Sequence, residues 1–262
     1  MNMSQSEKRK YLIQYLLDEN KRYKGYEIPT DTDEQRSLLR ALMNVRMPDP
    51  ISSDFLDIQD EYLKEEIEHG GIIDIEELSP VKSDDRIILW QGDITTLKAD
   101  AIVNAANSQM CGCFQPNHNC IDNIIHTKAG IRLRLKCYDI MEQQGYEEPT
   151  GQAKITPAYN LPCKYVIHTV GPIVQGKLNE EHCRLLESSY RSCLEIAEMH
   201  ELTSIVFCCI STGVFMFPND KAARIAVDTV KNYLDRTKTI KKVIFNVFKD
   251  IDKDIYSDLL TF

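Results

Sequence analysis

The sequence predicts an α/β fold, a three-layer α/β/α domain with a mixed, mostly parallel sheet, preceded by an α-helical N-terminal extension. Two observations lead to this prediction. From residue 85 onward, short apolar runs typical of buried strands alternate with amphipathic helical segments. The first 80 residues instead repeat apolar positions at helical spacing. We therefore divide the chain into a helical extension, residues 1–80, and an α/β domain, residues 81–262.

The extension contains three helical segments and little chemistry. Apolar residues recur at helical spacing within Leu12–Leu17, Leu38–Val45 and Phe55–Ile67. The pair Gly70–Gly71 is expected to end the third segment, since glycine commonly follows a helix C-terminus. No activity can be assigned to this part of the chain from its sequence.

The α/β domain is expected to begin with the strand RIILWQ, which ends at Gly92–Asp93. The strand ADAIVNAAN, one long helix IDNIIHTKAGIRLRLKCYDIMEQ, and the strands AKITPAYN and KYVIHTVGP follow. The helix NEEHCRLLESSYRSCLEIAEMH then leads to the strand SIVFCCIS, in which Cys208 and Cys209 are expected to be core residues. The loop STGVFMFP, the helix NDKAARIAVDTVKNYLDRT, the strand KKVIFNVF and a short helix complete the chain.

Composition excludes several classes of function. Lys and Arg total 31 against 40 Asp and Glu, a net charge of −9, so no broad nucleic-acid-binding surface is expected. The N-terminal MNMSQSEKRKYLIQYLLDEN lacks the apolar core of a secretory signal, and no apolar run has the length of a membrane span. We therefore expect a cytoplasmic protein. In that compartment, clustered cysteines more often bind metal or carry out chemistry than form disulfides, which applies to the nine cysteines here.

The most informative segment joins a predicted strand to a predicted helix. Ten consecutive positions of this segment contain three cysteines and one histidine: Cys111, Cys113, His118 and Cys120. Three protein ligands with one open position are typical of catalytic zinc, whereas four indicate a closed structural site. Ordinary buried cysteines beside an unrelated histidine are the alternative, and such dense clustering argues against it. The sequence therefore predicts a Zn²⁺ site in this loop.

Three loops follow predicted strands: Gly92–Asp93, Asn107–Cys120 and Ser211–Pro218. Ligands of open α/β sheets bind outside the carboxyl ends of the strands. The loop STGVFMFP leads directly into a helix, so its backbone N–H groups and the helix dipole are suited to a pyrophosphate. Plain capping of that helix explains the same residues equally well.

The motifs GDIT, ADAIVNAAN, CIDNIIHTKAG, KYVIHTVGP and ISTGVFMFP resemble, in order, the signatures of a macrodomain. This resemblance covers about residues 85–262 and implies binding of ADP-ribose, often with its hydrolysis from proteins. Where most of that family has a Gly-rich run, this chain has CGCFQPNHNC, which resembles the zinc-dependent macrodomains of microbes. These also have a helical N-terminal extension. The resemblance assigns zinc to Cys113, His118 and Cys120 and leaves Cys111 as a bystander. Met216 stands where the family pattern has glycine, which is expected to make that loop less flexible.

The resemblance also implies individual roles. Asp93 would accept a hydrogen bond from adenine, with Ile94 as a backbone donor, and Asn107 would hold the distal ribose; a turn-stabilising Asp93 and a loop-bracing Asn107 are the alternatives. Ile121 and Asn123 would face the pyrophosphate through backbone N–H groups. Phe248 would stack on adenine or be a core aromatic. The other predicted ADP-ribose contacts are Gly92, Cys120, Ser211, Thr212, Gly213, Val214, Phe215 and Met216.

Three nearby side chains are assigned to structure. Asp122 is expected to brace the helix start. His126 and His168 lie within a helix and a strand, and neither has a second metal ligand near it in the sequence.

The function implied is a zinc-dependent hydrolase that removes mono-ADP-ribose from acidic side chains of a protein, with Asn107, Cys113, His118 and Cys120 as its catalytic set. The alternatives are a non-hydrolytic ADP-ribose reader, an O-acetyl-ADP-ribose deacetylase, and a zinc ion that only pins the loop. The resemblance further implies a sirtuin-type ADP-ribosyltransferase as functional counterpart. It also implies a lipoyl-carrier protein of the glycine-cleavage H type as a candidate substrate.

Overall fold

A computed structural model describes residues 3–261. Its centre is a six-stranded sheet in the order β2-β8-β7-β4-β6-β5. Every neighbouring pair is parallel except β5 and β6, which confirms the predicted mixed, mostly parallel sheet. The strands are β2 (Ile87–Gln91), β4 (Ala101–Ala105), β5 (Ala153–Pro157), β6 (Tyr165–Thr169), β7 (Ser204–Phe207) and β8 (Lys242–Val247).

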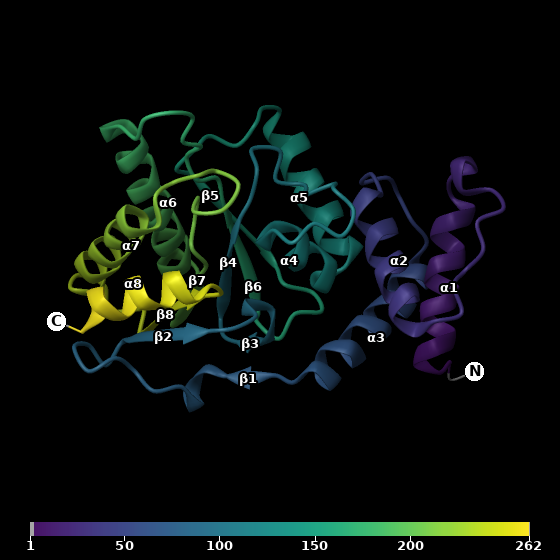
Figure 1. The fold of residues 1–262 in the computed structure, drawn as a ribbon, viewed down its shortest axis with the longest axis horizontal. Coiled ribbons are helices and arrows are strands. Elements are labelled where there is room, and N and C mark those ends of the chain that lie inside the picture. The colour runs from purple at the N-terminus through teal and green to yellow at the C-terminus, as the bar shows by residue number, and fades with distance from the viewer. Residues whose placement is uncertain (1–2, 262) are drawn as a thin grey trace.

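Helices cover both faces of this sheet, as the three-layer prediction requires. Figure 1 shows α6, α7 and α8 on one side of the strands and α4 and α5 on the other. Buried side chains from the strands and from these five helices form one hydrophobic core. The helices are α4 (Ile121–Ala129), α5 (Ile131–Gln144), α6 (Glu180–Met199), α7 (Asn219–Leu234) and α8 (Asp250–Leu260).

The N-terminal extension forms a second helical body beside α4 and α5 (Figure 1). It consists of α1 (Gln5–Asp18), α2 (Thr32–Val45) and α3 (Ser53–Gly70), with Gly71 ending α3. These helices share their own hydrophobic cluster, which Ile131 of α5 also joins. Shorter elements complete the fold: a two-stranded parallel sheet of β1 (Ile73–Asp74) and β3 (Leu97–Lys98), and the 3-10 helices η1 (Lys21–Tyr23), η2 (Ile75–Glu77) and η3 (Ile94–Thr96).

The single long helix predicted after residue 120 is wrong, because the chain breaks it at Gly130. This residue has φ 89° and both ends α4 and precedes α5. This left-handed backbone conformation favours glycine, and a Cβ there would also lie only 2.5 Å from Nε2 of Gln59. Gln59, in α3, accepts the Ile131 N–H at 3.1 Å and thereby caps α5 from the extension.

Two strands are shorter than their apolar runs predict. Strand β7 ends at Phe207, so Cys208 and Cys209 follow the strand instead of lying within it. Cys208 is buried, whereas Cys209 is only partly buried. Strand β8 ends at Val247, which places Phe248 in the loop beyond it. Residues beyond the end of a strand can remain buried where the chain turns. The apolar run in the sequence is then longer than the strand itself.

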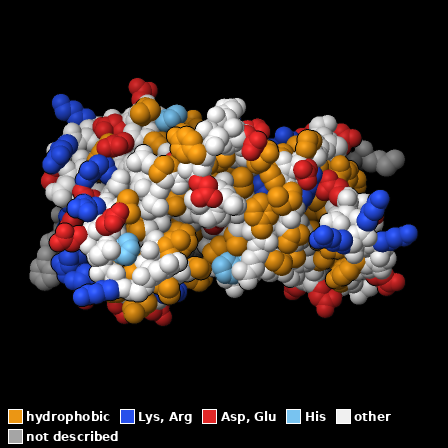
Figure 2. Space-filling view, turned by 90° about the horizontal axis from the view of Figure 1, so that it is seen from above, with side chains coloured by type: hydrophobic (Ala, Val, Ile, Leu, Met, Phe, Trp, Pro, Cys, Tyr) orange, Lys and Arg blue, Asp and Glu red, His pale blue; other side chains and the backbone are white. Residues whose placement is uncertain are grey.

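The exposed surface mixes both signs of charge. On the face seen in Figure 2, Lys and Arg gather mainly toward the two ends of the molecule, and uncharged or hydrophobic side chains dominate the middle. Within residues 3–261, no helix combines the length and the apolarity needed to cross a membrane.

Asp100 ties together the starts of three strands. Its carboxylate accepts hydrogen bonds from the N–H and hydroxyl of Thr203, at 2.8 and 2.7 Å, and from the Ser204 N–H at 3.1 Å. The Lys164 ammonium lies 2.7 Å from its other oxygen. Burial opposes ionisation of this carboxyl, but the bonds from Lys164 and Thr203 outweigh it and hold its pKa at about 2.

We predict that Asp100→Asn lowers the free energy of unfolding by about 2 kcal/mol at pH 7. The lowered pKa of the folded state means that this stabilisation is present above the unfolded-state pKa of about 4 and is lost as the pH falls toward 2. Urea unfolding of both proteins between pH 7 and pH 2.5 measures the difference. The exposed Asp258→Asn serves as control and is expected to change stability by less than about 0.5 kcal/mol. An Asp100→Asn deficit that is constant with pH would contradict this account.

Candidate active site

The carboxyl ends of the parallel strands bring the predicted ligand-binding loops to one edge of the sheet. Gln91 of β2 pairs with Val247 of β8, so Gly92 and Phe248 emerge side by side. The Gly92 N–H donates to the Val247 carbonyl at 3.0 Å, and the Asn246 amide donates to the Gly92 carbonyl at 2.9 Å. The loops after β4 and β7 leave the same edge, because these strands are also parallel neighbours.

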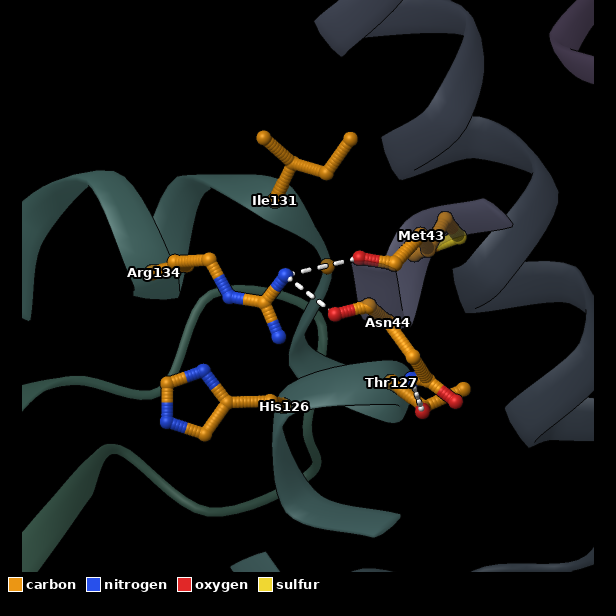
Figure 3. Close-up of a pocket in the computed structure, with 7 residues that line it drawn as sticks. Met43, Asn44, His126, Thr127, Ile131 and Arg134 are labelled. Carbon is orange, nitrogen blue, oxygen red and sulfur yellow. Dashed lines mark hydrogen bonds between the residues drawn. The ribbon is translucent and has the colours of Figure 1, made fainter. Parts of the chain in front are cut away.

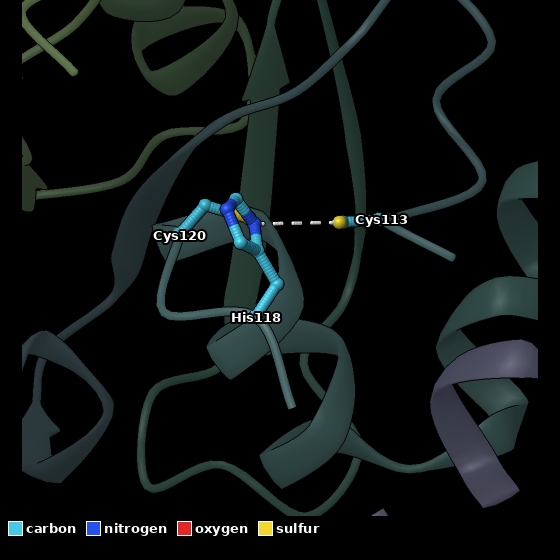
Figure 4. A group of neighbouring side chains, drawn as sticks. All are labelled: Cys113, His118 and Cys120. Atoms are coloured by element: carbon cyan, nitrogen blue, oxygen red, sulfur yellow. Dashed lines mark hydrogen bonds between the residues drawn. The ribbon is translucent and has the colours of Figure 1, made fainter. Parts of the chain in front are cut away.

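Cys113, His118 and Cys120 converge in the loop between β4 and α4. Their sulfur and ring-nitrogen atoms all lie within 4.8 Å of one another. The Cys113 Sγ is 3.6 Å from His118 Nδ1, the contact drawn as a dashed line in Figure 4. All three side chains are partly buried, which keeps them accessible from one side. Cys111 is buried and does not belong to this group.

This donor set fits a tetrahedral zinc ion. Zinc–sulfur and zinc–nitrogen bonds of about 2.3 and 2.0 Å at tetrahedral angles place the two atoms about 3.6 Å apart, and Cys113 and His118 have that separation. Burial, with a smaller contribution from the neighbouring Cys113, raises the pKa of the Cys120 thiol to about 12. A nearby divalent cation has the opposite effect on a thiol, so metal binding would release its proton.

Asn107 braces the start of the same loop. Its side-chain oxygen accepts the Gln109 N–H at 3.0 Å, and its amide donates to the Gly112 carbonyl at 3.2 Å. The side chain is only partly buried, so these bonds leave it reachable from the cleft edge. The bracing interpretation therefore describes bonds that are present, and contact with a ribose stays a prediction.

The start of α4 lies directly after Cys120, whose Sγ accepts the Asn123 N–H at 3.4 Å. This bond occupies one of the backbone donors predicted to meet a pyrophosphate. Helix geometry leaves the N–H groups of Ile121 and Asp122 without intrahelical partners. The Asn123 side chain is fully buried and donates to the carbonyls of Cys113 and Gln115, at 3.4 and 2.9 Å. Asn123 thus holds the loop between β4 and α4 through its side chain.

The loop after β7 has two strained residues. Ser211 and Met216 have φ of 65° and 55°, in the left-handed region that favours glycine. A Cβ on Gly171 would clash with the Ser211 hydroxyl at 2.1 Å, so the loop after β6 passes very close to it. The Val174 N–H donates to the Phe215 carbonyl at 2.9 Å and joins the two loops. The Ser211 Oγ is buried without a hydrogen-bond partner among the described residues.

The remaining predicted contacts also line this edge. Asp93 is exposed, and one of its oxygens accepts the Thr95 N–H and hydroxyl, at 2.9 and 2.6 Å. That bond is the turn-stabilising role of Asp93; its second oxygen is free to bind a ligand. Phe248 is 77% exposed, which rules out the core-aromatic alternative for it. Gly213 borders open space, since a Cβ added to it would have no atom within 4 Å. Val214 and Met216 in the same loop are exposed.

A buried polar cluster behind α4 contains both His126 and His168, and it corrects the prediction that neither has a second possible metal ligand nearby. His126, Cys137 and His168 bring their ligand atoms within 4.8 Å of one another, although no second ligand was expected near either histidine. Both ring nitrogens of His168 are engaged, at 3.1 Å from the Asn104 amide and 2.9 Å from the Thr156 hydroxyl. Burial lowers the pKa of His168 to about 3, so the ring is neutral. These bonds agree with a structural role for His168.

Asp122 braces α4 against the sheet from within this cluster. Its carboxylate accepts a hydrogen bond from the Asn104 amide at 2.8 Å and lies 3.6 Å from His126 Nε2. Burial raises the pKa of Asp122 to about 6.

Sequence reasoning missed the side chains that hold the metal loop from outside it. Arg40 and Asn44 of α2 and Arg134 of α5 bond to the loop or to the segment beside it. The first two lie in the extension, some 80 positions earlier in the chain. For Arg134 a local signal exists, since it lies on the buried face of α5 between Ile131 and Cys137. A charged residue on a helix face that is otherwise buried indicates a specific partner.

Known proteins resemble the whole chain. A family model described as "Macro domain" matches residues 103–226. A protein-ADP-ribose hydrolase of Treponema medium is 56% identical over 261 residues, covering 99% of this chain and 100% of the relative. A probable bifunctional ADP-ribose hydrolase/ADP-ribosyltransferase of Fusarium oxysporum f. sp. cubense is 43% identical, covering 93% of this chain and 44% of that protein. The solved structure of a Trypanosoma brucei macrodomain in complex with ADP-ribose has a TM-score of 0.65 at 30% identity, covering 84% of this chain and 94% of that one.

We predict that Met216→Gly raises the free energy of unfolding by about 0.5–1 kcal/mol. Relief of the left-handed backbone is worth about 1–2 kcal/mol, and the greater flexibility of glycine in the unfolded chain offsets part of it. Val214→Gly is the matched control, because Val214 is exposed in the same loop without a positive φ. This control is expected to lose about 0.4–1 kcal/mol. Urea unfolding distinguishes the two, and equal losses in both variants would show that Met216 is unstrained.

Proposed function

The chain belongs to the macrodomain family, and on this premise we propose that it is a zinc-dependent hydrolase that removes mono-ADP-ribose from acidic side chains of a protein. The 56% identity with a protein-ADP-ribose hydrolase over nearly the whole chain supports the activity. The metal and the linkage are inferred from the site itself.

One observation carries the zinc proposal. Two thiols and an imidazole, Cys113, Cys120 and His118, meet at the start of α4, at the edge where the ligand loops gather. These residues would hold the ion and leave one coordination position open. When bound, zinc supplies a Lewis acid that polarises an oxygen of the substrate or lowers the pKa of a coordinated water to about 7. A reader that only binds ADP-ribose has no need of such a group.

The residues of the chain would position the nucleotide along this edge. Asp93 and Phe248 would meet the adenine end, with one free carboxylate oxygen and an exposed ring. The loop from Ser211 and the start of α4 offer backbone N–H groups to the diphosphate. Asn107 would orient the distal ribose, whose anomeric carbon then faces the metal group. Holding the reacting carbon in place in this way supplies much of the rate enhancement.

The reaction itself favours an acidic attachment site. Water adds to the anomeric carbon, the bond from that carbon to the side-chain oxygen breaks, and ADP-ribose and the free side chain are released. A carboxylate leaves as a stable anion at neutral pH, because its conjugate acid has a pKa near 4. Such a linkage therefore needs no strong general acid, and the described site has zinc ligands and amides in place of one.

A transferase that attaches the ADP-ribose is the expected counterpart. The Fusarium relative, by its name, is a hydrolase and an ADP-ribosyltransferase in one chain, and the present chain matches 44% of it. This supports the proposal of an ADP-ribosyltransferase as counterpart; that it is of the sirtuin type rests on the resemblance in sequence alone. A lipoyl-carrier protein of the glycine-cleavage H type stays the candidate substrate.

We predict that the purified protein releases ADP-ribose from a protein modified on Asp or Glu and that removal of zinc with a chelator abolishes this release. Cys113→Ala and Asn107→Ala are expected to lower kcat about 100-fold or more, because they remove a metal ligand and misplace the ribose. Chromatography of the released ADP-ribose together with metal analysis measures both effects.

Cys111→Ala is the matched control, since this thiol is adjacent but outside the ligand group, and it should retain zinc and activity. Equal cleavage by the metal-free and the zinc-loaded protein would overturn the catalytic metal. Tight binding of ADP-ribose without turnover on any linkage would identify a reader. Faster turnover of O-acetyl-ADP-ribose than of modified protein would identify a deacetylase.

A further inference from the structure

The metal loop between β4 and α4 is bonded to the N-terminal extension at several points. We propose that the extension is a positioning element of the metal site and that Arg40 of α2 is its main positioning residue. This rests on the proposed function, because it concerns the same three zinc ligands. It adds a role for the part of the chain to which sequence reasoning could assign none.

Arg40 reaches the loop with its guanidinium. Its Nη2 donates to the His118 carbonyl at 2.7 Å and to the Asn123 side-chain oxygen at 2.9 Å, and its Nε lies 3.3 Å from that same oxygen. Both partners of Arg40 belong to the proposed zinc site or hold one of its ligands in place. His118 is a ligand, and Asn123 donates in turn to the carbonyls of Cys113 and Gln115. Arg40 thus fixes the backbone at one ligand directly and at a second through one side chain.

Two further residues of α2 hold the middle of the loop. Asn44 accepts the Asn117 N–H at 3.0 Å and donates to the Thr127 hydroxyl of α4 at 3.0 Å. The Asn117 side chain donates to the Ser37 hydroxyl at 3.1 Å. Asn117 has φ 53°, in the left-handed region that asparagine tolerates better than most residues other than glycine. Two of these bonds are made by Asn117, the residue directly before His118.

Arg134 of α5 connects the end of α2 to the start of the loop. Its Nη1 donates to the carbonyls of Met43, Asn44 and Arg46, at 2.8, 2.9 and 2.7 Å, and Figure 3 shows it pointing at the first two. Its Nε donates to the Cys111 carbonyl at 2.8 Å, and its guanidinium lies 4.3 Å from the centre of the Phe114 ring. A buried cation therefore satisfies carbonyls at the C-terminus of α2 and joins that helix to the loop.

These contacts act on the metal through the geometry of its ligands. Hydrogen bonds to the groups around a metal site orient the ligands, and loss of one typically costs 10–100-fold in metal affinity or activity. If the extension only stabilised the fold, a substitution in it would lower the stability of the whole protein. The zinc affinity of the folded site would then stay unchanged. Arg36 supplies this contrast, since it lies one turn earlier on α2 and pairs with Glu66 of α3 at 3.0 Å, away from the loop.

The test compares Arg40→Ala with Arg36→Ala in the full chain. The dissociation constant for Zn²⁺ is measured by competition with a chromophoric chelator, and kcat and KM are measured on a protein modified on Asp or Glu. For Arg40→Ala we expect zinc affinity to fall about 10-fold or more and kcat to fall with it. KM should change much less, because the nucleotide contacts at β2, β7 and β8 are untouched. Arg36→Ala should leave all three quantities at their wild-type values.

Cobalt-substituted protein gives an independent readout, because the visible absorption of Co²⁺ depends on its ligand geometry. Arg40→Ala is expected to alter this spectrum and Arg36→Ala to preserve it. If Arg40→Ala does not fold, Arg40→Lys serves in its place: it keeps the charge but cannot present two nitrogens in a fixed plane, so a smaller loss of zinc affinity is expected.

Wild-type zinc affinity, kcat and Co²⁺ spectrum in the Arg40 variants would overturn this inference while leaving the proposed function intact. A wild-type protein that hydrolyses its substrate without binding zinc would instead remove the zinc mechanism, and the positioning role with it. The two failures are therefore distinguishable by measuring wild type and variants side by side.

Discussion

The candidate site depends on one constraint, which is that a loop without regular secondary structure must hold the side chains of Cys113, His118 and Cys120 close together. Backbone groups of such a loop lack the partners that a helix or sheet provides, and buried polar groups left unpaired are costly. Here side chains take over that role. Asn107 bonds the Gly112 carbonyl, Asn123 those of Cys113 and Gln115, and Arg134 that of Cys111. The order of the loop is thus imposed by residues on the strand end and helices around it.

The position of α4 relative to the sheet depends on buried polar contacts as well as on apolar packing. Asn104, in the middle of β4, donates to Asp122 in the first turn of α4 and contacts His168 of β6. Apolar packing sets no bond direction, whereas these directional bonds add a specific constraint on the position of the helix start. Because Cys120 caps that same helix start, the register between sheet and helix also sets where one of the proposed zinc ligands lies.

Periodicity predicted the strands, most helices and the edge at which the loops meet, because local patterns determine these features. The break at Gly130 was missed, because Gln59, whose side chain lies against that glycine and caps α5, is far away in the sequence. The grouping of Cys113, His118 and Cys120 was predictable, since these residues share one short loop. Arg40 was not, because its partners lie about 80 positions further along the chain and no local pattern marks an arginine that bonds to carbonyls at that distance.

Packing across the predicted boundary at residue 80 bears on how the proposed metal site is stabilised. Gln59 of α3 caps α5, Ile131 of α5 joins the hydrophobic cluster of the extension, and Arg134 satisfies carbonyls at the end of α2. The extension therefore shares cap bonds, apolar contacts and buried charge with the helices that flank the loop. Ordering a loop costs about 1–2 kcal/mol of backbone entropy per residue, and here that cost is met during folding by contacts with this second helical body. A loop that is already ordered presents its ligands without further loss of entropy when a metal ion binds.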